Sequence, residues 1–354
     1  MDIDYLLFLQ NLRNTTEGLF DKFFVYVTGY GEMVCLLPLF ALIYWCINKR
    51  TGEFMFLTLA FSRLLNGLIK IWACIYRPWI RDIRVTPINN GMKTATGYSF
   101  PSGHTTNAVA TFGSYSVMQK NDSKYLKVLL WGLAILVAFS RNYIGVHTPQ
   151  DVIIGFISTI FVIFGTLKLF EIIEKKEKAD IWVAVVGLLI SLLIVVYALN
   201  KTYPINYRTN ETGITPTVYI TSSAVDKEIE KKAIVNPNEM LLDLYKNLGY
   251  IIGIFLGWII ERRFIKFSTD GTTDEKIFRY LICFILMQVM LNVICPQIKI
   301  RCPHKAISEP IIAFLKTFYI LGIAPIIIKL ISKIKKHKEN ENQDLLELKG
   351  ESQA

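Results

Sequence analysis

The amino-acid sequence predicts an all-α fold, a polytopic bundle of transmembrane helices. The chain has 354 residues, of which 52% are hydrophobic and 19% are charged, and its mean hydropathy is +0.38. Soluble domains carry about 25% charged residues. Long apolar runs also alternate with basic connections along the chain. These observations exclude an ordinary cytosolic enzyme and indicate a protein that crosses a bilayer many times.

Nine apolar runs are candidates for membrane spans, each of which needs about 20 mostly apolar residues. They cover residues 23–47, 54–75, 104–118, 126–139, 152–173, 181–199, 248–260, 277–294 and 311–331. The third, fourth and seventh runs are short and would need flanking residues to cross a bilayer. We therefore predict a core of about five spans followed by about four more.

The two ends of the chain differ from these apolar runs. Residues 1–13 (MDIDYLLFLQNLR) begin with acidic residues and lack the basic segment of a cleavable signal peptide. An amphipathic helix at the membrane interface fits them better. Residues 335–354 are densely charged, which predicts a disordered tail. Between the sixth and seventh runs, residues 200–245 are expected to form an exposed loop with some strand or short-helix content, since they contain Pro204, Pro216 and Pro237.

Lysine and arginine residues occur in alternate connections, which predicts the orientation of the chain. The basic residues of the connections expected in the cytoplasm are Lys49, Arg50, Lys120, Lys124, Lys127, Lys175, Lys176, Lys178, Arg262, Arg263, Lys266, Lys333, Lys335, Lys336 and Lys338. The N-terminus and the segments near 76–103, 140–151, 200–245 and 295–309 are then extracytoplasmic. The plasma membrane is the expected location.

Net charge and cysteine usage narrow the class of protein further. The net charge is +10, but the cations lie between or within apolar runs and form no solvated patch, which argues against nucleic acid as a partner. Six cysteines without a C-x-x-C pair give no zinc ribbon, thioredoxin motif or disulfide scaffold. Cys295 and Cys302 bracket one short loop and could form a disulfide only in an oxidising compartment. The oligomeric state is left open.

The first group of polar residues lies at the end of the second run. Lys70 follows Arg63 by two helical turns and Asn66 by one turn, so the three share one stripe of a helix. Arg77 comes after Lys70 with six residues between them. Ionisable groups at membrane depth are costly and are therefore functional candidates. The alternative for Lys70 is that its ammonium group simply reaches the lipid headgroups. Arg63 could add positive potential to a site beside Lys70, or it could only tie spans together.

The second group is Pro101-Ser102-Gly103-His104, at the start of the third run. A helix that begins at Ser102 points free backbone N–H groups at its N-terminal side, which favours an anion there. Gly103 leaves room for a ligand to approach the backbone. Serine and proline also start many helices that have no ligand, so this group alone does not decide between the two interpretations.

The third group contains Arg141, His147 and Asp151, before the fifth run. Thr148 and Pro149 have the form of a helix start, with Asp151 three residues after the N-cap. Asp151 could therefore serve only as a cap, with His147 as an ordinary loop residue. Alternatively, Asp151 accepts one ring N–H of His147 and leaves the other nitrogen as a nucleophile. The two roles of Asp151 are compatible.

The combination of the three groups favours a phosphate site. Two histidines and a carboxylate could bind a metal ion. However, the three cations Lys70, Arg77 and Arg141 would repel a metal ion and stabilise a phosphate.

The three groups, Lys70-x6-Arg77-Pro78, Pro101-Ser102-Gly103-His104 and Ser140-Arg141-x5-His147-x3-Asp151, resemble the signature motifs of the type-2 phosphatidic acid phosphatase superfamily. This superfamily also includes vanadium haloperoxidases, bacterial acid phosphatases and glucose-6-phosphatase. The resemblance covers roughly residues 1–175, the membrane phosphatase core. The resemblance does not extend to the rest of the chain. That part consists of an additional transmembrane region at 176–334, with its loop near 200–245, and the cytoplasmic charged tail at 335–354.

The resemblance implies a metal-independent reaction without a cofactor. It implies that His147 attacks phosphorus to form a phosphohistidine, that Asp151 orients it, and that His104 is first general acid and then general base. The residues that would hold the phosphoryl oxygens are Lys70, Arg77, Ser102, Gly103 and Arg141. The implied substrate is a lipid phosphate in the bilayer, such as phosphatidate, phosphatidylglycerol phosphate, undecaprenyl diphosphate or a sphingoid phosphate.

Two other functions remain open at this point. In a phosphotransferase, an acceptor alcohol instead of water would take the phosphoryl group from His147. In a phospholipid-binding transporter or scaffold, the cations alone would suffice. The presence of His104, His147 and Asp151 favours an enzyme, because a binding site needs no acid and no nucleophile. A haloperoxidase is disfavoured, because its substrates do not require nine spans.

Overall fold

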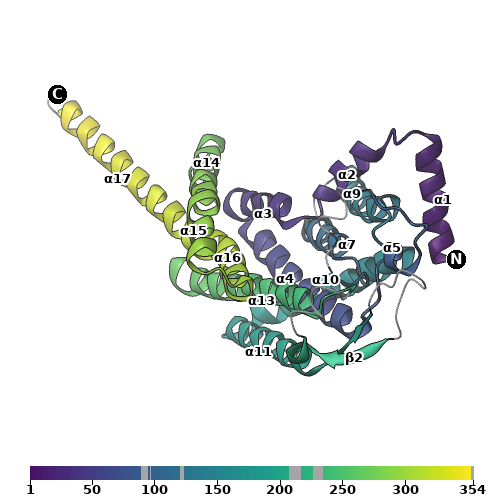
Figure 1. The fold of residues 1–354 in the computed structure, drawn as a ribbon. Coiled ribbons are helices and arrows are strands. Elements are labelled where there is room, and N and C mark those ends of the chain that lie inside the picture. Colours follow the sequence, from purple (N-terminus) through teal and green to yellow (C-terminus); the bar gives the residue numbers. More distant parts are fainter. Residues whose placement is uncertain (89–94, 96, 120–122, 207–216, 226–233, 352–354) are drawn as a thin grey trace.

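A computed structural model describes residues 1–88, 95, 97–119, 123–206, 217–225 and 234–351 (Figure 1). In the first half, the helices are α1 (Asp2–Thr15), α2 (Asp21–Gly29), α3 (Met33–Leu42), α4 (Lys49–Ala73), α5 (Pro78–Arg81), α7 (Gly103–Ala108), α8 (Ser114–Met118), α9 (Lys124–Tyr143) and α10 (Pro149–Lys175). In the second half, they are α11 (Ala179–Asn200), α13 (Pro237–Ile260), α14 (Thr273–Val289), α15 (Cys295–Arg301), α16 (Lys305–Phe318) and α17 (Ala324–Glu351). The predicted all-α helix bundle is confirmed.

Shorter elements join these helices. The π-helical segments η1 (Ile43–Ile47), η2 (Val109–Gly113), η4 (Glu261–Ile265), η5 (Met290–Ile294) and η6 (Tyr319–Ile323) continue neighbouring α-helices. In the predicted loop, β1 (Thr202–Ile205) pairs antiparallel with β2 (Val218–Thr221), and the 3-10 helix η3 (Ser222–Ala224) follows. The predicted strand and short-helix content of this loop is therefore confirmed. Lys120 and Pro216, which entered the sequence interpretation, lie outside the described residues.

The number of spans is smaller than predicted. All nine apolar runs are helical, but only six helices in the described chain are long and apolar enough to cross a membrane, or seven if the bent pair α2 and α3–η1 counts as one span. The two other predicted spans fall short of this for different reasons. The helix from α7 to α8 covers only residues 103–118. Helix α13 is long enough, but its first half carries polar residues such as Asp243, Lys246 and Asn247.

The bend between α2 and α3 brings the N-terminal part of the chain against α7. The two helices meet at 52°. Gly31 lies at the break, where a Cβ atom would approach the His104 Cβ to 2.9 Å. Asn107 Nδ2 donates a hydrogen bond of 2.9 Å to the Gly31 carbonyl oxygen. The break thus places Glu32, the residue before α3, beside His104.

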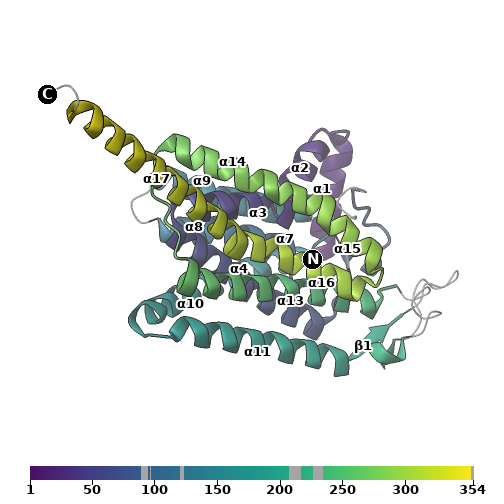
Figure 2. The same ribbon diagram turned by 90° about the vertical axis from the view of Figure 1, so that its left-hand side faces the viewer.

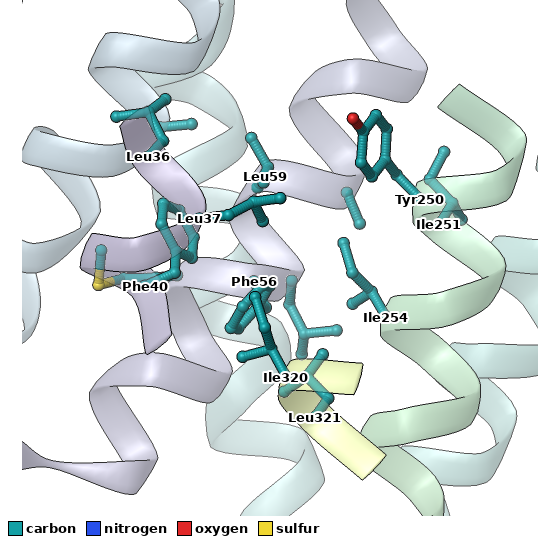
Figure 3. Packing of buried hydrophobic residues seen from close by; sticks show 14 of the residues in the cluster. Leu36, Leu37, Phe40, Phe56, Leu59, Tyr250, Ile251, Ile254, Ile320 and Leu321 are labelled. Carbon is teal, nitrogen blue, oxygen red and sulfur yellow. The ribbon is translucent and has the colours of Figure 1, made fainter. Parts of the chain in front are cut away.

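Buried apolar side chains from both halves of the chain form one core around α4 (Figure 3). Phe40 from α3 contacts Phe56 from α4 edge to face, with ring centroids 4.8 Å apart. Ile254 from α13 and Ile320 from η6 are buried in the same cluster. Trp45 Nε1 donates a hydrogen bond of 2.9 Å to the Ile320 carbonyl oxygen. The first and second halves therefore pack as one body.

Three glycines at four-residue spacing allow α13 to lie against α16 and η6. A Cβ atom on Gly249 would overlap the Pro310 carbonyl oxygen, and one on Gly253 would overlap Thr317 Oγ1. A Cβ on Gly257 would lie 2.8 Å from the Leu321 Cβ. Such a stripe of small residues is typical of closely packed membrane helices. The sequence interpretation did not include this stripe.

A buried ionic cluster joins α4, α11 and η4. Lys49 Nζ lies 2.6 Å from Glu261 Oε1, and Arg262 Nη1 lies 2.9 Å from Glu53 Oε2. Arg262 Nε is also 3.4 Å from Asp180 Oδ2. Leaving one partner of a buried ion pair alone costs about 3–5 kcal/mol. These basic residues therefore hold the two halves together in addition to indicating orientation.

Two expectations for the C-terminal half are wrong. The tail is not disordered, because α17 continues as a helix to Glu351 and projects from the bundle (Figure 2). Its sequence is rich in lysine, glutamate and leucine, which favour helix, and no proline interrupts it after Pro325. The disulfide is absent as well, since Cys295 and Cys302 are free thiols at opposite ends of α15. Seven helical residues span about 10 Å, which exceeds the Cα separation of about 7 Å that a disulfide tolerates.

Candidate active site

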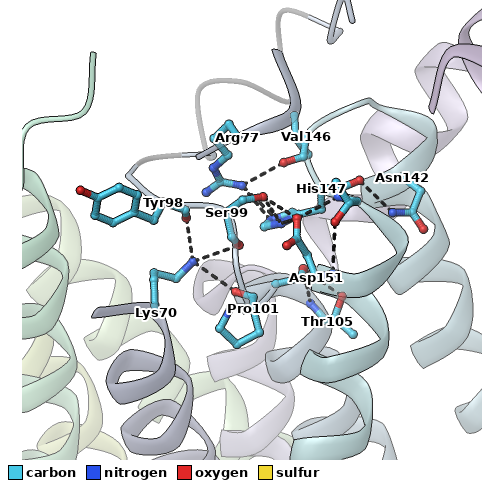
Figure 4. A network of polar contacts seen from close by, with 12 residues as sticks. Lys70, Arg77, Tyr98, Ser99, Pro101, Thr105, Asn142, Val146, His147 and Asp151 are labelled. Carbon is cyan, nitrogen blue, oxygen red and sulfur yellow. Dashed lines mark hydrogen bonds and ion pairs between the residues drawn. The ribbon is translucent and has the colours of Figure 1, made fainter. Parts of the chain in front are cut away.

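The three groups of polar residues meet at one cavity of about 270 Å³. The end of α4, the loop before α7, the first turn of α7 and the turn between α9 and α10 converge there (Figure 4). Of the eight residues predicted for the site, those that line the cavity are Lys70, Arg77, Gly103, His104 and His147. Ser102, Arg141 and Asp151 do not line it and are buried.

His147 is held by Asp151. The turn between α9 and α10 is fixed by Asn142 Nδ2, which donates to the His147 carbonyl oxygen at 2.9 Å. His147 Nδ1 lies 3.3 Å from Asp151 Oδ2, and each side chain is 2% exposed. The same carboxylate accepts the Thr148 N–H at 2.8 Å in a capping box. Asp151 therefore caps α10 and also lies within hydrogen-bond distance of the His147 ring. In the tautomer that carries its proton on Nδ1, the lone pair lies on Nε2.

Arg77 lies against that second nitrogen. Its Nη1 atom donates to His147 Nε2 at 2.8 Å and to the Val146 carbonyl oxygen at 3.0 Å, and its Nε atom donates to the Gly97 carbonyl oxygen at 3.1 Å. Burial lowers the pKa of His147 well below its ordinary value, and the nearby cations Arg77 and Arg141 lower it further. The imidazole is therefore neutral at neutral pH, as a nucleophile requires.

Arg141 is a buried cation with unused donors. It is 0% exposed, and its Nη1 atom donates to Thr28 Oγ1 at 2.7 Å. Its Nε and Nη2 atoms have no hydrogen-bond partner in the described part of the chain. Buried donors of this kind are rare in folded proteins, and a charged one favours an anionic acceptor. The donor set around His147 therefore fits a phosphate.

Lys70 is turned toward the loop before α7. Its Nζ atom donates to the carbonyl oxygens of Tyr98 at 3.0 Å, Ser99 at 3.4 Å and Pro101 at 3.1 Å. The ammonium group therefore lies inside the bundle. The alternative interpretation required it to extend to the lipid headgroups, which it does not do. In this arrangement Lys70 holds the loop that leads into Ser102.

Ser102 and Gly103 open α7 as predicted. Ser102 is the N-cap, and its Oγ atom accepts hydrogen bonds from the Thr105 N–H at 3.4 Å and the Thr105 hydroxyl at 2.9 Å. Among the described residues, a Cβ atom on Gly103 would meet only Asn66 Oδ1, at 4.0 Å. The glycine therefore leaves space on the cavity wall that no atom of the described residues fills.

Replacing Gly103 with alanine is expected to reduce activity without reducing stability. The added methyl group enters the cavity where a phosphoryl oxygen would approach the backbone, so kcat/KM should fall roughly ten- to a hundredfold. The melting temperature should not fall, because alanine is favoured over glycine in helices by up to about 1 kcal/mol. Phosphate-release kinetics and thermal melts in detergent check both parts. Unchanged kinetics would mean that substrate does not approach this turn.

Two polar residues of the site were missed in the sequence. Glu32 Oε1 lies 3.7 Å from His104 Nε2. A carboxylate inside the apolar run 23–47 was a signal for it. Ser99 donates its hydroxyl to Asp151 and lies 3.3 Å from His147 Nδ1. No pattern around Ser99 distinguishes it from an ordinary loop serine.

The far wall of the cavity comes from α13, a helix that the sequence interpretation did not connect with the site. Its lining residues are Met240, Asp243, Leu244, Lys246, Asn247 and Tyr250. The signal was the group of polar residues directly before the apolar run 248–260. Arg63 on α4 lines the cavity and bonds to α13 and α7. It donates from Nε to Asn247 Oδ1 at 2.9 Å and from Nη1 to Asn107 Oδ1 at 3.1 Å.

Two family comparisons match separate parts of the chain. Residues 54–175 match the PAP2 superfamily, and residues 245–336 match a family described as "PAP2 superfamily phosphatase, transmembrane extension". The first match covers the three motifs. The second covers most of α13, including the cavity residues Lys246, Asn247 and Tyr250. No solved structure gives a significant match.

Individual relatives agree with these matches. Lipid phosphate phosphatase delta of Arabidopsis thaliana is 25% identical over 53% of this chain, which spans only about half (48%) of that protein. Phosphatidylglycerophosphatase B of Bacillus subtilis is 29% identical over 43% of this chain and 74% of its own length. Lipid A 4'-phosphatase of Porphyromonas gingivalis is 30% identical over 44% of this chain and 67% of its own length.

Proposed function

The chain belongs to the PAP2 superfamily of phosphatases, and from this membership we propose that it is a multi-pass membrane enzyme that hydrolyses a phosphomonoester or diphosphate on a lipid headgroup. The observation that carries the proposal is the position of His147 between Asp151 and Arg77, on the same cavity as His104. A binding protein would need the cations, but it would not need a neutral imidazole oriented by a carboxylate.

In the first step, His147 Nε2 attacks phosphorus. A bond forms between Nε2 and phosphorus, and the bond from phosphorus to the lipid oxygen breaks. His104 gives its proton to the departing oxygen. The Nδ1–H that His147 donates to Asp151 stabilises the positive charge that develops on the ring. Arg77 moves its N–H from Nε2 to a phosphoryl oxygen, and Arg141 supplies Nε and Nη2, which have no acceptor among the described residues.

In the second step, water hydrolyses the phosphohistidine. His104, now neutral, accepts a proton from the water as its oxygen bonds to phosphorus, and the bond between phosphorus and Nε2 breaks. Inorganic phosphate leaves, and His104 is again protonated. Lys70 acts with Ser102 and Gly103 at the first turn of α7, where Lys70 orients the loop and the backbone favours an anion. These steps use protein groups and water, so the proposed mechanism needs no divalent metal.

The relatives and the basic connections of the chain support a lipid phosphate as the substrate. The named relatives act on phosphatidylglycerophosphate and lipid A phosphate, which supports a lipid phosphate here. The alternating basic connections support a site on the extracytoplasmic side of the plasma membrane. Phosphatidate, phosphatidylglycerol phosphate, undecaprenyl diphosphate and sphingoid phosphates all present phosphate at headgroup depth.

A phosphate-release panel over these four lipids in detergent tests the proposal. We expect release from at least one of them, unchanged in the presence of EDTA. Loss of activity on chelation would contradict the metal-free mechanism. Transfer of phosphate to an added alcohol without release of inorganic phosphate would instead identify a phosphotransferase. Absence of turnover with every lipid would contradict the proposed function.

A further inference from the structure

The cavity is larger than the phosphate site and continues from His147 along α4 to Arg63 and α13. We propose that this inner part is a second anion subsite, formed by Arg63, Asn107 and Asn247, and that it selects lipid phosphates whose headgroup carries another anionic group. The inference rests on the proposed function, because it describes the leaving-group side of the same site. It assigns a role to a helix of the transmembrane extension.

Arg63 is a partly buried cation that is held only by neutral groups. Its Nε atom donates to Asn247 Oδ1 at 2.9 Å, Nη2 donates to the same oxygen, and Nη1 donates to Asn107 Oδ1 at 3.1 Å. The Tyr250 ring lies 5.1 Å from the guanidinium carbon. No carboxylate in the described chain forms an ion pair with Arg63. A cation in such a place favours an anion that enters the cavity.

The other charges of this wall are already balanced. Lys246 Nζ lies 3.8 Å from Asp243 Oδ1 and 4.0 Å from Glu309 Oε2, and Glu309 also pairs with Lys299 at 3.0 Å. Asp243 also acts electrostatically on Arg63, but the charges of the two lysines and the two carboxylates cancel, so the inner cavity keeps the net positive charge of Arg63. Neutral partners orient this charge without neutralising it, as expected for a binding group and unlike the ionic cluster at Lys49 and Glu261.

Helix geometry separates the two anion sites. Arg63 and Lys70 are seven residues apart on α4, which is two turns and about 10 Å along the helix axis. Long side chains in a helix lean toward its N-terminus, so the side chains of Arg63 and Lys70 lean in the same direction and keep this separation. A second phosphate bonded directly to the first is too close to reach Arg63. A phosphodiester or phosphate farther along the headgroup fits the separation better. The subsite therefore distinguishes phosphatidylglycerol phosphate from phosphatidate and from a polyprenyl diphosphate.

Steady-state kinetics on these three lipids test the subsite. In Arg63→Gln, kcat/KM for phosphatidylglycerol phosphate should fall at least about tenfold, while kcat/KM for phosphatidate and undecaprenyl diphosphate should change by less than about threefold. Arg63→Lys, which keeps the charge, should restore part of the loss. Glu53→Gln is the matched control, because it removes a contact between α4 and η4 away from the cavity, and it should leave the ratio among the lipids unchanged.

A second measurement uses the wild-type protein alone. Phosphatidylglycerol carries the phosphodiester without the terminal phosphate, so it should inhibit phosphatidate hydrolysis competitively, whereas diacylglycerol, which lacks a phosphodiester, should not. Equal losses on all three lipids in Arg63→Gln, or equal effects of the two inhibitors, would overturn the subsite and leave the phosphatase intact. Absence of turnover with all three lipids would overturn the proposed function itself.

Discussion

Replacing His147 with alanine is expected to lower kcat/KM by about a thousandfold or more on every lipid substrate, because the substitution removes the nucleophile and leaves only binding and charge stabilisation. The wild-type protein should also retain labelled phosphate when it is quenched during turnover, in a bond that is stable to alkali and labile to acid. The His147→Ala protein should retain none. Phosphate-release kinetics and quench-trapping measure the two effects.

The control for this substitution is His304→Ala. His304 precedes α16 and does not line the cavity, so its loss should leave kcat/KM unchanged. A His147→Ala protein that keeps more than a tenth of the wild-type rate, with a normal melting curve, would show that the phosphoryl group does not pass through this residue.

Replacing Gly253 with leucine is expected to have the largest effect on stability. A Cβ at this position overlaps Thr317 Oγ1 and the Phe314 carbonyl oxygen, so α13 must move away from α16. Thr317 would also lose its hydrogen bond of 3.0 Å to the Tyr250 carbonyl oxygen. We expect a loss of at least about 3 kcal/mol, which for a chain of 354 residues corresponds to a fall in Tm of roughly 4 °C. Thermal melts and the yield of monodisperse protein in detergent measure this effect.

The matched control is Gly165→Leu on α10, where a Cβ atom meets nothing within 4 Å. This variant should have the Tm of the wild-type protein, because its new side chain meets no neighbour. The pair is matched, since both substitutions replace glycine with leucine in a helix. If the two variants behave alike, the close approach of α13 to α16 does not stabilise the fold.

Local patterns in the sequence were sufficient to predict the helix starts that position the proposed catalytic groups. Thr148, Pro149 and Asp151 specify a helix start within four residues, and the structure has that capping box. Ser102 likewise caps α7. Local geometry of this kind depends on near neighbours in the chain, so a single sequence reveals it. The nine apolar runs gave the positions of the helices for the same reason.

Contacts with residues outside the three motifs could not be predicted. Nothing near Asn247 indicates that it meets Arg63, because the two residues are 184 positions apart and their contact depends on the packing of α13 on α4. Glu32 meets His104 only because α2 and α3 bend at Gly31. Nine spans were predicted, whereas six helices of the described chain, or seven with the bent pair, have the length and mean hydropathy that a span needs. The polar residues of α13 lower its mean hydropathy, and they face a cavity.

The wall that α13 contributes has an evolutionary consequence. The groups predicted to carry out the reaction lie within residues 70–151, whereas much of the opposite wall belongs to residues 240–250. Substitutions in that one helix could change which headgroup is accepted while the reacting groups stay untouched. A protein built in this way can diverge in selectivity and conserve its chemistry.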